Sequence, residues 1–185
     1  TILSPVHGPK TFRPAFAQSR LRKSAMRIFS DSKLCSIATV TRNKKAHINT
    51  AYFAFSNDLT LFFLSDPNST HCQNLSSNPS TAVAIYNSSQ HWKGPDRGIQ
   101  LFGRCAQTEG VQTQEAERFY SKRFPKYLKW KKTFSTLGRR NTIRYQFYRF
   151  VPQRLKILDE REFGYGVFLE VTVNRKTERQ WGNDR

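Results

Sequence analysis

The feature that most constrains the fold of this chain is a succession of short apolar runs separated by polar turn sequences. Residues 34–41 (LCSIATVT) and residues 46–55 (AHINTAYFAF) are rich in β-branched and aromatic side chains, and the polar sequence RNKK lies between them. The sequence SND then leads into residues 59–64 (LTLFFL). Three such runs joined by tight turns predict an antiparallel meander.

The pattern changes after residue 64, where hydroxyl and amide side chains become frequent. Ser69 is suited to the N-cap of a helix, because its hydroxyl can accept a hydrogen bond from a free N–H group of the first turn. Residues 70–76 suit two helical turns, and Asn78 followed by Pro79 ends them. The later pattern predicts strands at residues 81–86 and 97–106, helices at 112–123 and 125–132, strands at 143–151 and 154–158 that Pro152 separates, and a last strand from residue 166.

Length and apolar content favour one domain that is rich in strands. The chain has 185 residues, of which 37% are hydrophobic and 14% aromatic, so it can form a substantial core. Aromatic side chains pack well on a pleated surface. We therefore expect a mainly β fold with some helix.

The charge is strongly basic, with a formal net charge of +18 from 31 Lys and Arg against 13 Asp and Glu. Such a chain attracts phosphorylated ligands, polyanions or anionic surfaces. Its basic residues concentrate at residues 10–27 and 122–144. Four aromatic residues interleave with the second block: Phe124, Tyr127, Trp130 and Phe134. They could stack on nucleic-acid bases, but their spacing of three and four residues favours a helix packed on the rest of the fold.

Several function classes find no support in the sequence. No run approaches the roughly 20 apolar residues that span a bilayer, and residues 1–27 contain no apolar signal core, so we expect a soluble cytoplasmic protein. No GxSxG, HExxH, P-loop or dinucleotide-binding pattern occurs. We expect no metal site, because neither the histidines nor the cysteines show metal-ligand spacing: His7, His47, His71 and His91, and Cys35, Cys72 and Cys105. The three thiols are expected to be reduced.

A candidate anion site lies where the third strand leads into the short helix. Ser65, Ser69, Thr70 and His71 combine hydroxyl groups with the free N–H groups of a helix start, which bind phosphate well. A protonated His71 would add charge beside a phosphate dianion, and the helix dipole adds about 0.3–1 kcal/mol for an anion. The alternative is an ordinary helix cap that binds nothing.

The flanking residues favour the anion site, because residues 34–108 resemble the FMN-binding split-barrel family of pyridoxamine 5′-phosphate oxidase. The motifs that carry the resemblance occur in the family order: SIATV at 36–40, INTAYF at 48–53, LFFLSD at 61–66, STH at 69–71, NL at 74–75, NP at 78–79 with VA at 83–84, and RGIQLFG at 97–103. Residues 147–152 (FYRFVP) and 155–159 resemble the closing strands of the family.

The resemblance implies a six-stranded antiparallel split β-barrel with flanking helices, in the α+β class. It also implies a homodimer with an FMN in each of two clefts between the subunits. On this basis we expect a basic N-terminal segment or helix at residues 1–30, the FMN-binding domain at 31–173 and a polar tail at 174–185.

The family pattern also assigns binding residues. The phosphate contacts correspond to Ser65, Ser69, Thr70 and His71, and the flavin ring is expected along Asn49, Thr50, Ala51 and Tyr52. The partner subunit is expected to contribute Trp92, Arg97 and Gln100. The oxidases carry Arg and Lys where this chain has Thr70 and His71, and their C-terminal substrate motif is not recognisable before Arg185. We therefore do not expect a true pyridoxamine 5′-phosphate oxidase.

The leading functional hypothesis is an FMN-dependent oxidoreductase that moves hydride or electrons between flavin N5 and a small, possibly anionic substrate. A non-catalytic protein that binds flavin, haem or the deazaflavin F420 is the alternative. Haem would need an axial ligand, for which His47, His71 and His91 are candidates. A basic nucleic-acid-binding protein is the third possibility, and it is not favoured.

Overall fold

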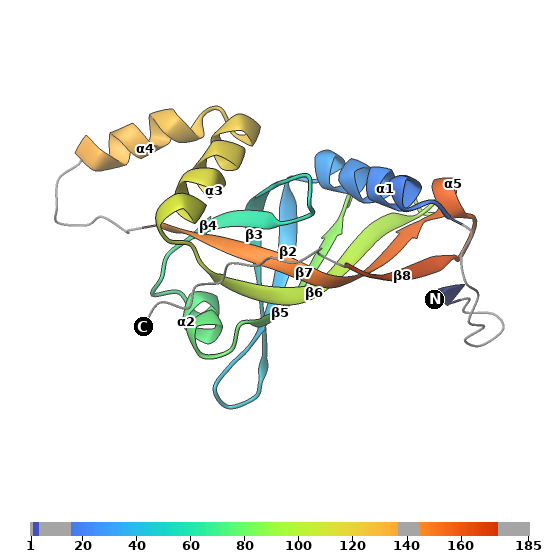
Figure 1. Ribbon diagram of the computed structural model, residues 1–185, viewed down its shortest axis with the longest axis horizontal. Coiled ribbons are helices and arrows are strands. Elements are labelled where there is room, and N and C mark those ends of the chain that lie inside the picture. Colours follow the sequence, from blue (N-terminus) through green and yellow to red (C-terminus); the bar gives the residue numbers. More distant parts are fainter. Residues whose placement is uncertain (1, 4–15, 137–144, 174–185) are drawn as a thin grey trace.

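The computed structural model describes residues 2–3, 16–136 and 145–173 (Figure 1). In these residues the strands are β1 (Ile2–Leu3), β2 (Leu34–Val40), β3 (Ala46–Phe55), β4 (Leu61–Ser65), β5 (Ser80–Tyr86), β6 (Arg97–Gln107), β7 (Gln146–Asp159) and β8 (Phe168–Thr172). The helices are α1 (Gln18–Asp31), α2 (Thr70–Ser77), α3 (Gly110–Arg123), α4 (Tyr127–Thr136) and α5 (Glu160–Phe163).

Six antiparallel strands close into a barrel in the order β7-β4-β3-β2-β5-β6, and β6 pairs back with β7. The closure depends on the length of β7, whose residues 146–150 pair with β4. Residues 154–158 of β7 pair with β8 instead, and β1 pairs with β8. The expected six-stranded split barrel of the α+β class is confirmed, with a strand pair added beside β7.

The barrel interior follows from strict alternation along the strands. In β2 and β5 every second residue is buried, so one face of each strand points into the core. Fully buried Phe53, Phe63, Leu101 and Ile157 come from four different strands and fill this interior. The core therefore forms inside the barrel.

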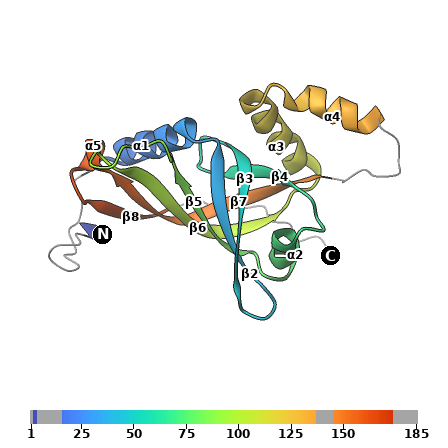
Figure 2. The same cartoon turned by 180° about the vertical axis from the view of Figure 1, so that it is seen from behind.

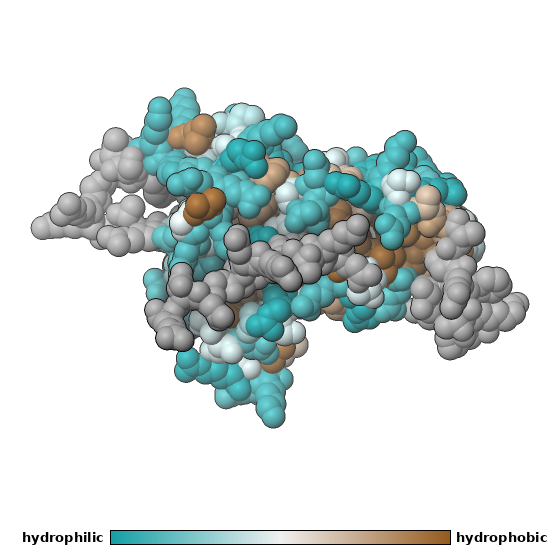
Figure 3. Space-filling model, viewed as in Figure 1, coloured by the Kyte–Doolittle hydropathy of each residue, from teal (hydrophilic) through white to brown (hydrophobic). Residues whose placement is uncertain are grey.

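Two helices cover parts of the barrel (Figures 1 and 2). Helix α1, which begins in the expected N-terminal segment at residues 1–30 and ends at Asp31, buries Ala25, Ile28 and Phe29 in the same core cluster as the barrel strands. Helix α2 is fixed through Asn74, whose Nδ2 donates to the buried Thr39 Oγ1 at 3.0 Å. The face seen in Figure 1 is mostly hydrophilic; apolar residues gather between α1 and β8, and a few single ones show elsewhere (Figure 3).

A second apolar cluster lies under α3 and α4, on the outer side of β4 and β7. Phe62, Phe147, Tyr120 and Tyr127 are buried there, and Trp130 packs against them. Phe124 also belongs to this cluster, so three of the four interleaved aromatics pack as the helix alternative predicted. The side chain of Phe134 lies outside the described residues.

The prediction that Pro152 divides two strands is wrong, because β7 continues through it. The β6–β7 register shifts at this place: Phe102 pairs with Arg154, but Gly103 pairs with Pro152, so Gln153 has no partner on β6. This is a β-bulge, where a missing proline N–H does not break the ladder. A Cβ on Gly103 would lie 2.1 Å from the Val151 carbonyl oxygen, so the close approach requires glycine.

The described residues include neither a helix that could span a membrane nor a cluster of metal-ligating side chains. None of the helices in the described ranges combines the length and the apolar character that crossing a membrane requires. Among the same residues, no group of three or more His, Cys, Asp or Glu side chains could hold a metal ion. Cys35, Cys72 and Cys105 are free and buried, and burial raises the pKa of the Cys35 thiol to about 12.

Candidate functional site

The structure brings three of the four predicted phosphate residues together at the end of β4. Ser65 is the last residue of β4 and is buried, and its Oγ lies 2.7 Å from His71 Nε2 in the first turn of α2. Ser69 Oγ lies 3.3 Å from the same nitrogen. Thr70, the fourth, is the exposed first residue of α2. Two hydroxyls and one imidazole therefore share a single point at a helix start.

Ser69 is the N-cap residue of α2, as predicted, but its hydroxyl does not cap the helix. The Oγ donates instead to the Asp66 carbonyl oxygen at 2.7 Å. The predicted side-chain cap is wrong, because no N–H of the first turn donates to this hydroxyl, which is directed towards the Asp66 carbonyl oxygen and His71 Nε2. The N–H groups of the first turn therefore do not donate to the Ser69 hydroxyl. They can bind an anion at the positive end of the helix dipole.

His71 has a second imidazole beside it. The ring of His47, on β3, lies parallel to that of His71 with their centroids 6.5 Å apart and their planes 7° apart. Burial lowers the pKa of His71, and the charge of His47 lowers it further. The expected imidazolium at His71 is therefore disfavoured in the ligand-free protein, because a charged ring would be partly desolvated beside another ring of the same kind.

The predicted flavin strand, Asn49 to Tyr52, presents two different faces. Asn49 and Ala51 pair with the inward-facing Ile37 and Cys35, whereas Thr50 and Tyr52 point outward. The structure thus places Asn49 on the strand face that also carries His47. Asn49 Oδ1 is buried and has no hydrogen-bond partner among the residues that the structure describes. Such an orphan acceptor is costly, and a ligand hydroxyl or N–H would satisfy it.

The outward-facing residues form a separate surface across four strands. Thr50 lies opposite Ser36, Ser36 opposite Ala84, and Ala84 opposite Gln100, so these residues make one row on the outer face of β3, β2, β5 and β6. Large apolar side chains flank the row and are exposed: Ile48 (68%), Tyr52 (56%), Tyr86 (56%) and Leu34 (46%). We call these four residues and the row the outer apolar face.

Arg97 and Trp92 lie away from the phosphate residues. Arg97 pairs with Asp159 at one end of β7, whereas Ser65 pairs with Gln146 at the other end. The Arg97 guanidinium binds the Asp31 carboxylate. Trp92 is 89% exposed, and the Lys93 ammonium lies over its ring. Within one chain, Arg97 and the neighbouring Trp92 therefore do not meet the phosphate cluster.

Two features of the site were not expected from the sequence. The first is the stacking of His47 on His71, since His47 is expected only as a candidate haem ligand. This stacking depends on a contact between β3 and α2, whose residues are far apart in the chain. The sequence gives no local signal for that contact. The alternation of β3 does carry a signal for the second feature, because it separates Asn49 from its neighbours Thr50 and Tyr52.

Comparison with known families agrees with the architecture. The family model described as pyridoxamine 5′-phosphate oxidase matches residues 21–156, which is more than half of the chain. A search of curated proteins found no match.

Solved structures with the same fold include two proteins described as binding or storing haem and one described as a putative oxidase. The haem-binding protein from Mycobacterium smegmatis has a TM-score of 0.63 and 16% identity over 88% of this chain, which spans 60% of that protein. HutZ, a haem storage protein from Vibrio cholerae, has a TM-score of 0.59 and 16% identity over 83% of this chain and 96% of its own. A putative pyridoxamine 5′-phosphate oxidase from Listeria innocua has a TM-score of 0.54 and 16% identity, covering 75% and 98% of the two chains. At these identities the likeness concerns the fold.

Proposed function

Because the chain belongs to the pyridoxamine 5′-phosphate oxidase family, we propose that it binds FMN with the phosphate at the start of α2. The observation that carries this proposal is the convergence of Ser65, Ser69 and His71 on one point. Hydroxyl donors, an imidazole and a helix N-terminus are suited to a phosphate dianion. The absent Arg and Lys of the oxidases leave the phosphate fewer charged partners in this chain.

The residues around this point fit the rest of an FMN molecule. The orphaned Asn49 Oδ1 needs a hydrogen-bond donor, which a ribityl hydroxyl or a flavin N–H supplies. A phosphate beside His71 would favour its protonated form, because an opposite charge raises a histidine pKa that burial has lowered. Binding of the phosphate should therefore be coupled to uptake of a proton by His71.

The proposed assembly is a homodimer formed through the outer apolar face. Leu34 and Tyr52 lie opposite each other on this face, and large apolar side chains that are grouped and exposed mark interaction sites. Ser36 and Ala84, in the middle of the face, are small, so a second copy could approach closely. The partner copy is proposed to contribute Arg97, Trp92 and Gln100, as the family resemblance implies, and Arg97 lies at the other end of β7 from the phosphate residues of its own chain.

The proposed activity is an oxidoreductase in which the flavin, when bound, supplies hydride or electron transfer at N5. The protein residues then bind the phosphate, orient the ring and exclude water. The formal charge of +18 favours an anionic substrate, since long-range attraction speeds its encounter with the site. We place the protein in the cytoplasm, where its three buried thiols remain reduced.

A spectroscopic titration tests the proposal. Purified protein freed of ligands is mixed with FMN, and the flavin absorption band and the thermal midpoint are followed. We expect a shifted band and a higher midpoint, because a ligand at 100 times its Kd stabilises by about 2.7 kcal/mol. A protein that changes neither the band nor the midpoint with FMN contradicts the proposal. FMN binding without turnover of NAD(P)H or another reductant removes only the oxidoreductase assignment.

Haem binding is the second candidate, because two imidazoles lie at the site. His47 and His71 could provide an axial ligand, and two proteins of the same fold are described as haem-binding or haem-storing. Haemin titration distinguishes the two functions. Haem is favoured if the wild type does not bind FMN but shifts the Soret band of haemin, and if His47→Gln or His71→Gln abolishes that shift. The deazaflavin F420 is a third ligand for the same titration.

A further inference from the structure

The basic residues of α3 and α4 have no role in the proposed FMN site. The two helices and the turn between them, residues 110–133, carry seven Lys and Arg residues and two Glu residues. Arg123 is engaged in the fold, because it binds two carbonyl oxygens at the end of α1. Lys131 forms an ion pair with Glu117. Two glutamates cannot balance seven cations, so these helices carry a net positive charge.

Four of these cations are exposed: Arg118, Lys122, Lys126 and Lys129. In the part of the chain that the structure describes, none of the four forms an ion pair with a carboxylate. Arg118 and Lys122 are four residues apart on α3, and such residues are neighbours on one side of a helix. Lys126 begins the first turn of α4, because its carbonyl oxygen accepts from the Trp130 N–H at 3.0 Å. Lys129 follows Lys126 by three residues, so the four cations lie along adjoining helical turns.

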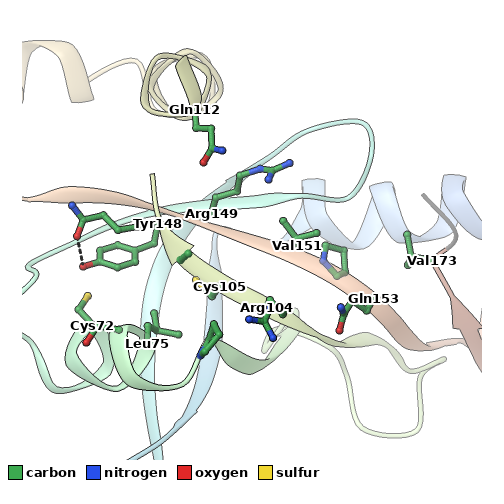
Figure 4. A pocket seen from close by; sticks show the side chains of 15 residues that line it. Cys72, Leu75, Arg104, Cys105, Gln112, Tyr148, Arg149, Val151, Gln153 and Val173 are labelled. Carbon is green, nitrogen blue, oxygen red and sulfur yellow. Dashed lines mark hydrogen bonds between the residues drawn. The ribbon is translucent and has the colours of Figure 1, made fainter. Parts of the chain in front are cut away.

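Helix α3 turns its other side towards the barrel. Gln112 points from α3 into the cavity beside β7 (Figure 4). Ala116 and Tyr120 follow Gln112 at intervals of four residues and are buried. Because an α-helix has 3.6 residues per turn, Arg118 and Lys122 lie on the side away from this row. The packing of α3 on the barrel therefore directs these two charges outwards.

The aromatic residues of α4 point towards the fold and not towards solvent. The Tyr127 ring is buried, with its centroid 5.3 Å from that of Tyr120 and 5.9 Å from that of Phe147. Trp130 packs against the same cluster. Proteins that bind single-stranded nucleic acid stack its bases on exposed aromatic rings. This surface lacks such rings among the described residues of α4, so its contacts with a polyanion are to charged groups.

The position of α4 favours one kind of polyanion. In both views α4 extends to one side of the barrel, away from α1 and β8 (Figures 1 and 2). The major groove of B-DNA is about 12 Å wide and admits an α-helix, whereas the major groove of duplex RNA is deep and narrow. A helix that lies on a lipid surface buries a broad apolar face. Leu128 is the one large apolar side chain that the described part of α4 exposes, so a lipid surface fits less well.

We propose that α3 and α4 form a docking surface for double-stranded DNA. Lys126 and Lys129 contact phosphates beside the major groove that receives α4, and Arg118 and Lys122 contact the adjoining backbone. Contacts with phosphates carry no sequence information, so the binding is independent of DNA sequence. The proposal does not depend on FMN, because Ser65, Ser69, His71 and Asn49 lie outside α3 and α4.

Fluorescence anisotropy of a short labelled DNA duplex of mixed sequence tests the proposal with the full chain. The association constant should fall between about 50 and 200 mM NaCl with a logarithmic slope of about −3 to −4, because four phosphate contacts release about 0.9 counterion each. The triple variant Lys122→Gln/Lys126→Gln/Lys129→Gln should weaken binding at low salt by about tenfold or more and reduce the slope by about 2–3.

A matched variant separates this surface from the general charge of the chain. Lys23→Gln/Lys44→Gln/Lys45→Gln removes the same charge from exposed positions of α1 and the β2–β3 turn, and should retain the salt slope. Circular dichroism establishes that both triple variants are folded. Single-stranded DNA, duplex RNA of the same sequence and phosphatidylserine vesicles should each bind more weakly than duplex DNA. The proposal is wrong if the wild type does not bind the duplex at low salt, if both triple variants lose equal affinity, or if one of the three other polyanions binds as tightly.

Discussion

The Oγ of Ser65 and the Nε2 of His71 lie 2.7 Å apart and join the end of β4 to the first turn of α2. This contact fixes the imidazole at the helix start, where the N–H groups point out of the helix. Ser69 approaches the same nitrogen from the N-cap. The site is thus organised by a side-chain contact between a strand and a helix, and not by the helix cap that the local sequence suggested.

The first prediction concerns the pH dependence of stability. Burial lowers the pKa of His71, so below the ordinary histidine pKa of about 6.5 the unfolded chain binds more protons than the folded protein. The free energy of unfolding is therefore fully retained above that value and falls as the pH falls towards the folded pKa. Urea unfolding of ligand-free protein between about pH 7 and 5 should show this loss.

His71→Gln should reduce that loss, because the substituted side chain does not titrate. His91→Gln is the matched control, since His91 is exposed in the loop between β5 and β6. An identical pH dependence in wild type and His71→Gln would show that other groups determine it.

The second prediction concerns Arg123, which ties α3 to the end of α1. Its Nη2 donates one hydrogen bond to the Phe29 carbonyl oxygen, at 2.6 Å, and another to the Ser32 carbonyl oxygen. The guanidinium also lies over the rings of Phe53 and Phe55. Arg123→Lys keeps the charge but loses the planar fork, so it should lower the free energy of unfolding by about 1–2 kcal/mol.

The control for Arg123 is Arg118→Lys, which changes the same residue type at an exposed position of α3. Denaturant unfolding should show almost no change for it. Equal unfolding free energies for both variants would mean that the contacts of Arg123 do not stabilise the fold.

The third prediction concerns the β-bulge. Gly103→Ala places a Cβ against the Val151 carbonyl oxygen, which is backbone and cannot move away cheaply. We expect a loss of about 3 kcal/mol, the upper range for forced overpacking. Gly98→Ala, on the same strand, meets the Tyr86 Cβ at 3.4 Å and the Ile85 carbonyl oxygen at 3.5 Å, which are close to ordinary contacts, and should cost much less. Thermal unfolding of the two variants measures the difference, and similar midpoints would contradict the account of the bulge.

The fourth prediction concerns the proposed dimer. Ala84 lies in the middle of the outer apolar face, so Ala84→Arg should place a charge in the interface and produce monomers. Gln114→Arg adds the same charge to an exposed position of α3 and should leave the dimer intact. Sedimentation velocity measures both. A wild-type monomer at micromolar concentration, or a dimer of Ala84→Arg, would exclude this interface.

The strands could be predicted because their local pattern agrees with their surroundings. Residues 46–55 were expected as a strand and form β3 with the same bounds, since apolar residues and turn sequences mark both ends. Strand β7 was less predictable, because Pro152 normally ends a strand. Strand β7 tolerates Pro152 because Gly103, which lies on β6, permits the bulge. Local sequence does not contain that pairing.

The candidate site was partly predictable for the same reason. Ser65, Ser69 and His71 are close in the sequence, and a strand–helix junction brings them together in space. The stacking of His47 and the separation of Arg97 from Ser65 depend on strand register. The ionisation of His71 depends on burial, which a local motif does not determine.

The most direct test of the central claim compares FMN with riboflavin, which lacks the phosphate. Fluorescence titration of the ligand-free wild type should show FMN binding at least about tenfold more tightly, because charge-assisted hydrogen bonds contribute about 1.5–3 kcal/mol. Ser65→Ala and His71→Gln should reduce this difference, whereas Ser76→Ala, on the same helix, should not. Equal affinities for FMN and riboflavin, or an FMN preference that both site variants retain, would contradict a phosphate site at the start of α2.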